Sequence, residues 1–274
     1  QRITEINGKR YRVQENIFKE RAILKSLTRG KQAPHEIVQY KDWFDDGQNY
    51  YLVMENGGTS LFDFVVKCHQ YISIGKISIA EWHKFVQLAL KQMVHVLHYM
   101  HSRGFAHFDF SLENMLINEV DVEVDDEDNF RFVLNDKRKP VQIKLCDFGL
   151  AEMFAMDDDG NPVFTTSKNA GKPNYKSPEM RDPNIESLSA AANDVWCLGV
   201  CLFMMLCGGM PFQRAQKDDK DFQQMIGGRL KQRLTEWQRT DYVSQELIDL
   251  LQAFMKYEGE RITLAQLRRH PWLQ

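Results

Sequence analysis

The sequence lacks a basic excess, a paired set of cysteines and a long apolar run. Its 274 residues carry 35 Lys and Arg against 38 Asp and Glu, a formal net charge of −3. We therefore expect no nucleic-acid partner, because such partners usually require a basic surface. Five cysteines are an odd number, which favours free thiols and a cytoplasmic or nuclear location over a disulfide framework. No uninterrupted apolar run approaches the roughly 18 residues of a membrane span, and no secretory segment follows Gln1.

The residues that are present describe an ordinary folded protein of one large domain or two unequal lobes. Hydrophobic residues make up 43% and charged residues 27% of the chain, which is close to the average for globular domains. Apolar spacing predicts a helix over residues 15–27. Two strand-like runs between Val38 and Glu55 flank a polar turn and predict a hairpin. The pair Gly57 and Gly58 then predicts the boundary of a small β-rich lobe.

The rest of the chain predicts a larger and mainly helical lobe. Strong helical periodicity covers Ile79–Ser102, and two short strands are expected at residues 114–117 and 141–145. Ser189–Cys207 is apolar on every face, which is typical of a buried helix. The fold class is therefore α+β, with a predicted small lobe at residues 1–56 and a large lobe at 57–274.

Three short motifs follow one another in a fixed order. They are HFDFSLEN at His107–Asn114, DFG at Asp147–Gly149 and SPE at Ser177–Glu179. Each alone is weak, but the three in this order resemble the protein kinase catalytic domain, and the resemblance covers nearly the whole chain. It implies a two-lobed fold over residues 1–274 that transfers the γ-phosphoryl group of Mg·ATP to a protein hydroxyl.

The resemblance also implies roles for individual residues. Asp109 would be the catalytic aspartate that orients the hydroxyl, and Asn114 and Asp147 would bind Mg²⁺. Glu20 resembles the small-lobe helix glutamate that pairs with a strand lysine. At the adenine end, Met54 resembles the gatekeeper, Glu55 to Gly57 the hinge, and Leu116 the floor. Structural roles are implied for Leu24, Tyr40, His107 and Phe148 as an apolar spine, for Glu179 with Arg261 as an ion pair, and for Asp194 beneath the catalytic loop.

Two family features are not found where the resemblance expects them. There is no Gly-rich loop, and the family spacing before Glu20 leads to residues 1–5, none of which is Lys. Our interpretation is that these elements lie upstream of the given sequence; the alternative is a loss of the ATP clamp. Phe108 also stands where the family has an Arg that receives an activation-loop phosphate, which puts phosphate-driven ordering of that loop in doubt.

A third departure concerns the catalytic lysine. Ser111 occupies the position of the family's catalytic-loop Lys, whereas Lys172 occupies that of a Thr on the facing segment. We hypothesise that the two residues are exchanged, so that Lys172 supplies the ammonium group beside Asp109 and the γ-phosphate. The alternative is a solvent-facing Lys on a loop. Cys146, directly before Asp147, is either an accessible thiol at the ATP site or a small buried residue.

The fourth departure is an acidic insertion at about residues 118–140, for which we expect a surface hairpin. Taken together, the patterns predict a serine/threonine protein kinase that uses ATP and Mg²⁺ and acts on a protein substrate. The alternative is a pseudokinase, a binding or scaffold module that keeps the fold without turnover. A small-molecule kinase is disfavoured by the peptide-docking segment at residues 175–179. The oligomeric state is left open.

Overall fold

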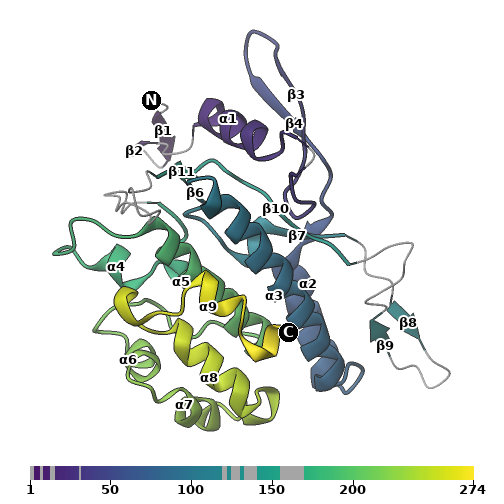
Figure 1. The fold of residues 1–274 in the computed structure, drawn as a ribbon, viewed down its shortest axis with the longest axis vertical. Coiled ribbons are helices and arrows are strands. Elements are labelled where there is room, and N and C mark those ends of the chain that lie inside the picture. The colour runs from purple at the N-terminus through teal and green to yellow at the C-terminus, as the bar shows by residue number, and fades with distance from the viewer. Residues whose placement is uncertain are drawn as a thin grey trace.

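The computed structural model describes residues 3–6, 9–12, 16–30, 32–118, 122–124, 130–132, 141–154 and 170–274. A helix and a long hairpin lie at one end of the molecule, a group of helices lies at the other, and short strands lie between them (Figure 1). The helices are α1 (Ile17–Leu27), α2 (Leu61–Ser73), α3 (Ile79–Ser102), α4 (Pro178–Arg181), α5 (Ala190–Cys207), α6 (Lys220–Ile226), α7 (Leu230–Glu236), α8 (Gln245–Phe254) and α9 (Leu264–Leu267).

The strands form small antiparallel sheets. They are β1 (Ile3–Ile6), β2 (Lys9–Arg12), β3 (Tyr40–Asp45), β4 (Tyr50–Met54), β5 (Thr59–Ser60), β6 (Phe105–Ala106), β7 (Met115–Ile117), β8 (Val122–Val124), β9 (Phe130–Phe132), β10 (Ile143–Leu145) and β11 (Glu152–Met153). The order β10–β7–β5 makes a three-stranded sheet, and the pairs are β1–β2, β3–β4, β6–β11 and β8–β9.

The small-lobe elements form as their sequences predict. Helix α1 begins after Asn16, whose side chain accepts hydrogen bonds from the backbone N–H groups of Phe18 and Lys19, because such a cap satisfies donors that lack helical partners. The hairpin β3–β4 turns at Asp46, whose carboxylate accepts from the N–H groups of Gln48 and Asn49. Both the helix and the hairpin predictions are confirmed, with α1 beginning two residues later than expected.

Helix α3 and helix α5 form the centre of the large lobe. The predicted bounds of α3 are confirmed, and a capping box between Ser78 and Glu81 begins the helix. The indole N–H of Trp82 donates to the Met205 carbonyl at 2.7 Å, which joins α3 to α5 within the core. Helix α5 is the one helix in the described part of the chain long and apolar enough to cross a membrane, yet 89% of it is buried inside the fold. Its burial confirms the prediction.

Three predictions from the sequence are not fully tested by the residues that the structure describes. Side chains before Asn16 are not described, so the residues expected near a strand lysine stay untested. Most of the acidic insertion also lies outside the described residues, although β8 and β9 pair antiparallel within it. The lobe boundary at Gly57 stays a prediction. Helix α2 was not anticipated, although the Ser60 cap and apolar residues at helical spacing signal it.

Candidate active site

The loop that carries Asp109 is held from below by α5. Asp194 accepts hydrogen bonds from the backbone N–H groups of His107 at 2.8 Å and Phe108 at 2.9 Å. Its Oδ2 also lies 3.0 Å from His101 Nε2. Phe108 has a φ of 63°, a left-handed conformation that a non-glycine residue adopts only when its surroundings require it. The paired hydrogen bonds to Asp194 provide that requirement and fix the backbone just before the next residue, Asp109.

The Asp109 carboxylate binds three N–H donors from two other segments. Its Oδ2 accepts from Lys172 Nζ at 2.6 Å and from Asn114 Nδ2 at 2.7 Å. Its Oδ1 accepts from the Lys172 backbone N–H at 2.9 Å. Lys172 therefore contacts Asp109 through both its backbone and its side chain, which is the arrangement that the exchange hypothesis requires and the solvent-facing alternative does not.

Gly171 makes this close approach possible. Its φ is +83°, and a Cβ atom built on it would lie 2.4 Å from the Phe108 carbonyl oxygen. No side chain fits there, because real Cβ atoms do not approach backbone oxygen so closely. The glycine therefore brings the two loops into contact and places the Lys172 N–H on Asp109.

The remaining capacity of the cluster decides what it can bind. A carboxylate offers about four acceptor positions, of which the three donors above use three. One position on Oδ1 is left for a further donor, such as a substrate hydroxyl. An ammonium has three N–H donors, so Lys172, whose side chain is 32% exposed, can also donate to a bound anion.

Ser111, unlike Lys172, is closed off from solvent. It is fully buried, and its hydroxyl has no hydrogen-bond partner within the described residues. A buried hydroxyl cannot replace an ammonium, because it carries no charge to offset that of a phosphate. The cation near Asp109 is therefore supplied by Lys172.

Asn114 and Asp147 are brought together by the backbone between them. The N–H of Cys146 donates to the Asn114 carbonyl at 2.9 Å, so the residue after Cys146, Asp147, lies beside Asn114. Because Asn114 Nδ2 donates to Asp109, its amide oxygen faces away from Asp109. Asp147 is exposed and has a φ of 62°. An amide oxygen and an exposed carboxylate fit Mg²⁺, which prefers oxygen ligands.

Of the four residues predicted to form the apolar spine, two are in direct ring contact and all four lie in or against buried surroundings. Leu24, His107 and Phe148 are fully buried, and Tyr40 packs against the same core cluster as Leu24 and Phe148. The rings of His107 and Phe148 meet at 5.3 Å between centroids. Phe148 therefore points into the core, so that Asp147, its neighbour, turns outward.

Cys146 is a half-buried thiol. Its Sγ donates to the Asn114 carbonyl at 3.2 Å. Burial raises the pKa of Cys146 to about 12, and the charge of Asp147 acts in the same direction while Lys172 opposes it. This hydrogen bond and the raised pKa favour a small packed residue over an accessible thiol at the ATP site.

We expect the native protein to react very slowly with a thiol reagent at pH 8. The pKa values of Cys68 and Cys207 are also raised to about 12 by burial, and those of Cys197 and Cys201 are raised by burial as well. Only about 10⁻⁴ of a thiol with a pKa near 12 is thiolate at pH 8. Ellman's reagent should detect far less than one thiol in minutes, but five in guanidinium chloride. Rapid modification of Cys146 in the native protein would contradict this expectation.

The residues predicted for the adenine end lie close to one another. Met54 ends β4, and Glu55 and Gly57 follow it. A Cβ on Gly57 would lie 2.8 Å from Leu116 Cδ1, so the hinge and the floor are in direct contact. Glu20 lies in the first turn of α1, and its charge contributes to raising the pKa of Cys146.

The segment after Lys172 is anchored to the large lobe. Tyr175 donates its hydroxyl to Glu113 at 2.8 Å. Glu179 and Arg261, both buried, form a two-bonded ion pair at 3.0 and 2.8 Å. The Phe108 ring, which replaces the family's Arg, packs in an apolar cluster with Ala170 and Met180. Apolar packing therefore joins the catalytic loop to both sides of this segment, a role the sequence did not reveal.

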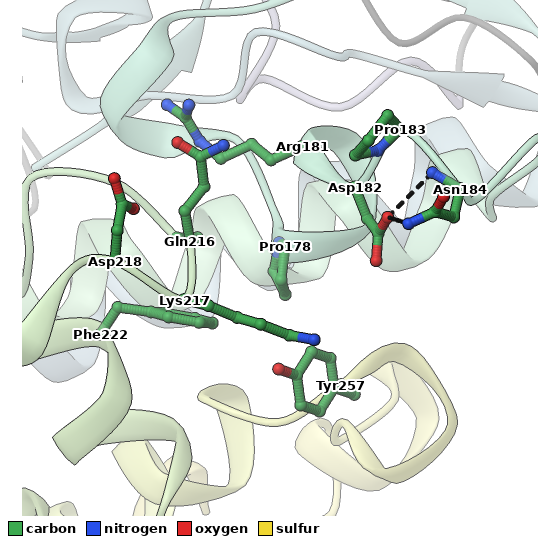
Figure 2. Close-up of a pocket in the computed structure, with 11 residues that line it drawn as sticks. Pro178, Arg181, Asp182, Pro183, Asn184, Gln216, Lys217, Asp218, Phe222 and Tyr257 are labelled. Atoms are coloured by element: carbon green, nitrogen blue, oxygen red, sulfur yellow. Dashed lines mark hydrogen bonds between the residues drawn. The ribbon is translucent and has the colours of Figure 1, made fainter.

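A cavity of about 390 Å³ lies beyond this segment, between α4, the loop before α6 and Tyr257 (Figure 2). Phe222 and Pro178 line it, and its charged residues are Arg181, Asp182, Lys217 and Asp218. It contains none of the predicted site residues. The candidate active site is therefore defined by the Asp109 cluster and not by this cavity.

The fold and this cluster have the arrangement of a two-lobed protein kinase domain. The chain belongs to the protein kinase domain family, whose sequence model matches residues 3–273. It is 26% identical to calcium-dependent protein kinase 3 of Plasmodium berghei over 241 residues, which are 87% of this chain and 36% of that protein.

Two other relatives show the same pattern. The chain is 26% identical to the calcium/calmodulin-dependent protein kinase cmkA of Emericella nidulans, over 88% of this chain and 49% of that protein. It is 28% identical to the MAP kinase-interacting serine/threonine-protein kinase mnk-1 of Caenorhabditis elegans, over 87% of this chain and 33% of that protein. The chain thus spans about a third to a half of the length of these relatives.

Proposed function

We propose that this protein is a serine/threonine protein kinase that transfers the γ-phosphoryl group of Mg·ATP to a hydroxyl of a protein substrate. The observation that carries the proposal is the Asp109 carboxylate, held by Lys172 and Asn114 with one acceptor position left. Phosphoryl transfer depends mainly on positioning and on neutralising charge, and this cluster offers both.

Each residue has a defined task in this proposal. The Asp109 carboxylate accepts a hydrogen bond from the substrate hydroxyl and so orients its oxygen toward the phosphate. The Lys172 ammonium stabilises the negative charge of the transferred group while keeping Asp109 in place. Mg²⁺ bound by Asn114 and Asp147 would neutralise further phosphate charge. Met54, the Glu55–Gly57 hinge and Leu116 would hold the adenine ring.

Serine and threonine are the proposed acceptors for two reasons. The segment Tyr175–Glu179 resembles the ending of serine/threonine kinase activation segments, and one similar protein carries serine/threonine-protein kinase in its name. We also propose a cytoplasmic or nuclear location, which the five free thiols support.

A pseudokinase remains the competing function, favoured by the buried Ser111 in place of a lysine. Incubating the protein with radiolabelled ATP, Mg²⁺ and a mixed Ser/Thr/Tyr peptide library separates the two. We expect label on phosphoserine or phosphothreonine and none with Asp147→Asn. Nucleotide binding without label would favour the pseudokinase. Label on phosphotyrosine would contradict the acceptor assignment.

A further inference from the structure

We infer that the ion pair between Lys144 and Glu55 positions the adenine-binding hinge over the floor of the nucleotide site. Lys144 would act as a positioning residue for adenine, since it reaches the hinge through Glu55 and not through a bound nucleotide. The inference rests on the proposed nucleotide-dependent function. It starts from a buried lysine that none of the motifs above explains.

The Lys144 ammonium is buried and fully engaged. Lys144 is 6% exposed. Its Nζ lies 3.0 Å from Glu55 Oε1 and 3.1 Å from Glu55 Oε2, and it donates to the His35 carbonyl at 2.9 Å. A buried ammonium is costly unless it is paired and hydrogen-bonded, so this geometry holds the hinge residue firmly to β10.

Glu55 is held on its other side by Gln39. The Glu55 backbone N–H donates to the Gln39 carbonyl at 2.9 Å, and Glu55 Oε2 accepts from the Gln39 N–H at 3.2 Å. The side chain therefore lies between the Gln39 backbone and the Lys144 ammonium. With its backbone and carboxylate both bonded, the first hinge residue has one orientation.

The floor lies directly across from Lys144. In the antiparallel pair of β10 and β7, Lys144 is opposite Leu116, and residues opposite one another in such a pair extend from the same face. Leu116 in turn meets Gly57, two residues after Glu55. The Lys144–Glu55 ion pair therefore connects the floor and the hinge of the adenine site. It reaches the floor through β10 and the hinge through Glu55.

The aspartate proposed to bind Mg²⁺, Asp147, follows shortly after β10. Leu145, next to Lys144, donates to the Glu36 carbonyl at 2.8 Å and accepts from the Val38 N–H at 3.1 Å. These bonds hold β10 against the residues that precede β3. Because Asp147 follows two residues later, the adenine and phosphate ends of the site share one support.

The test compares the binding of adenosine, Mg·ATP and Mg·tripolyphosphate by calorimetry. Lys144→Met keeps most of the apolar stem and removes the ammonium. We expect adenosine and Mg·ATP to bind about tenfold more weakly, since small displacements of a positioning group are felt strongly in such sites. Tripolyphosphate, which has no adenine, should bind unchanged. Lys144→Arg should restore adenosine binding to within about threefold of the original protein.

Two further variants guard against loss of folding. Glu55→Gln removes the charge but keeps an acceptor for the Gln39 N–H, and it should give the same selective loss of adenosine binding. Lys231→Met removes an exposed lysine that contacts Gln245 and should change nothing.

The inference is overturned if Lys144→Met and Glu55→Gln lower the melting temperature but leave adenosine affinity intact. Equal weakening of adenosine and tripolyphosphate would also overturn it, because the effect would not be confined to the adenine end. So would an original protein that binds no adenosine. An original protein that binds adenosine but phosphorylates no substrate defeats the proposed function and leaves this inference standing.

Discussion

Replacing Lys172 with alanine is expected to lower kcat by about 10²- to 10³-fold, the usual cost of removing one group that stabilises charge in the transition state. Lys172 Nζ lies 2.6 Å from Asp109 Oδ2, and the buried Ser111 cannot replace its charge. The Kd of Mg·ATP should change far less than kcat, because the residues proposed to bind the adenine ring do not include Lys172. Initial rates and calorimetric binding measure the two quantities separately.

The exchange between the two loops has its own control. Adding Ser111→Lys to Lys172→Ala returns the ammonium to the opposite loop and should recover part of the lost rate. Ser111→Lys alone should not help, because two ammonium groups would then compete for one carboxylate. If Lys172→Ala retains its rate, Lys172 is not the catalytic cation. If the double variant stays inactive while folded and able to bind Mg·ATP, the exchange account fails.

Replacing Glu179 with glutamine is expected to lower the free energy of unfolding by about 3–5 kcal/mol, the typical cost of leaving one charge of a buried pair without its partner. The Arg261 side chain is 1% exposed. Its Nη1 donates to the Ala192 carbonyl at 2.9 Å, and Glu179 also accepts from the Glu258 N–H at 2.8 Å. The Arg261 bonds to the Ala192 and Lys256 carbonyls keep Arg261 in place after the substitution, so its charge stays buried. Urea unfolding followed by circular dichroism measures the loss.

An exposed pair provides the matched control for Glu179. Asp218→Asn breaks the contact with Arg214, in which both side chains are more than half exposed, and solvent screens such pairs. We expect no resolvable change in the urea midpoint. A Glu179→Gln variant as stable as Asp218→Asn would show that the buried pair does not support the fold. Loss of activity without loss of stability would instead assign Glu179 a role at the substrate site.

Local sequence determined the helices because their signals are local. The spacing of apolar residues and the Ser78–Glu81 capping box define α3 within its own turns, and the same holds for the Asn16 cap of α1. The motifs predicted Asp109, Asn114 and Asp147 as site residues, since the family pattern depends on short spacings. The structure describes side chains only from Asn16 onward. The location of the strand lysine therefore stays a prediction from the sequence.

Only the tertiary structure decided which residues act together. Asp109 and Lys172 are 63 positions apart, and Lys144 and Glu55 are 89 apart. Such pairs form when loops and strands pack, and their residue types alone do not specify a partner. Spacing could suggest that Ser111 and Lys172 were exchanged, but the close approach at Gly171 places the ammonium on Asp109. The sequence thus determined the elements and the chemistry of single residues, whereas packing determined the contacts through which that chemistry can operate.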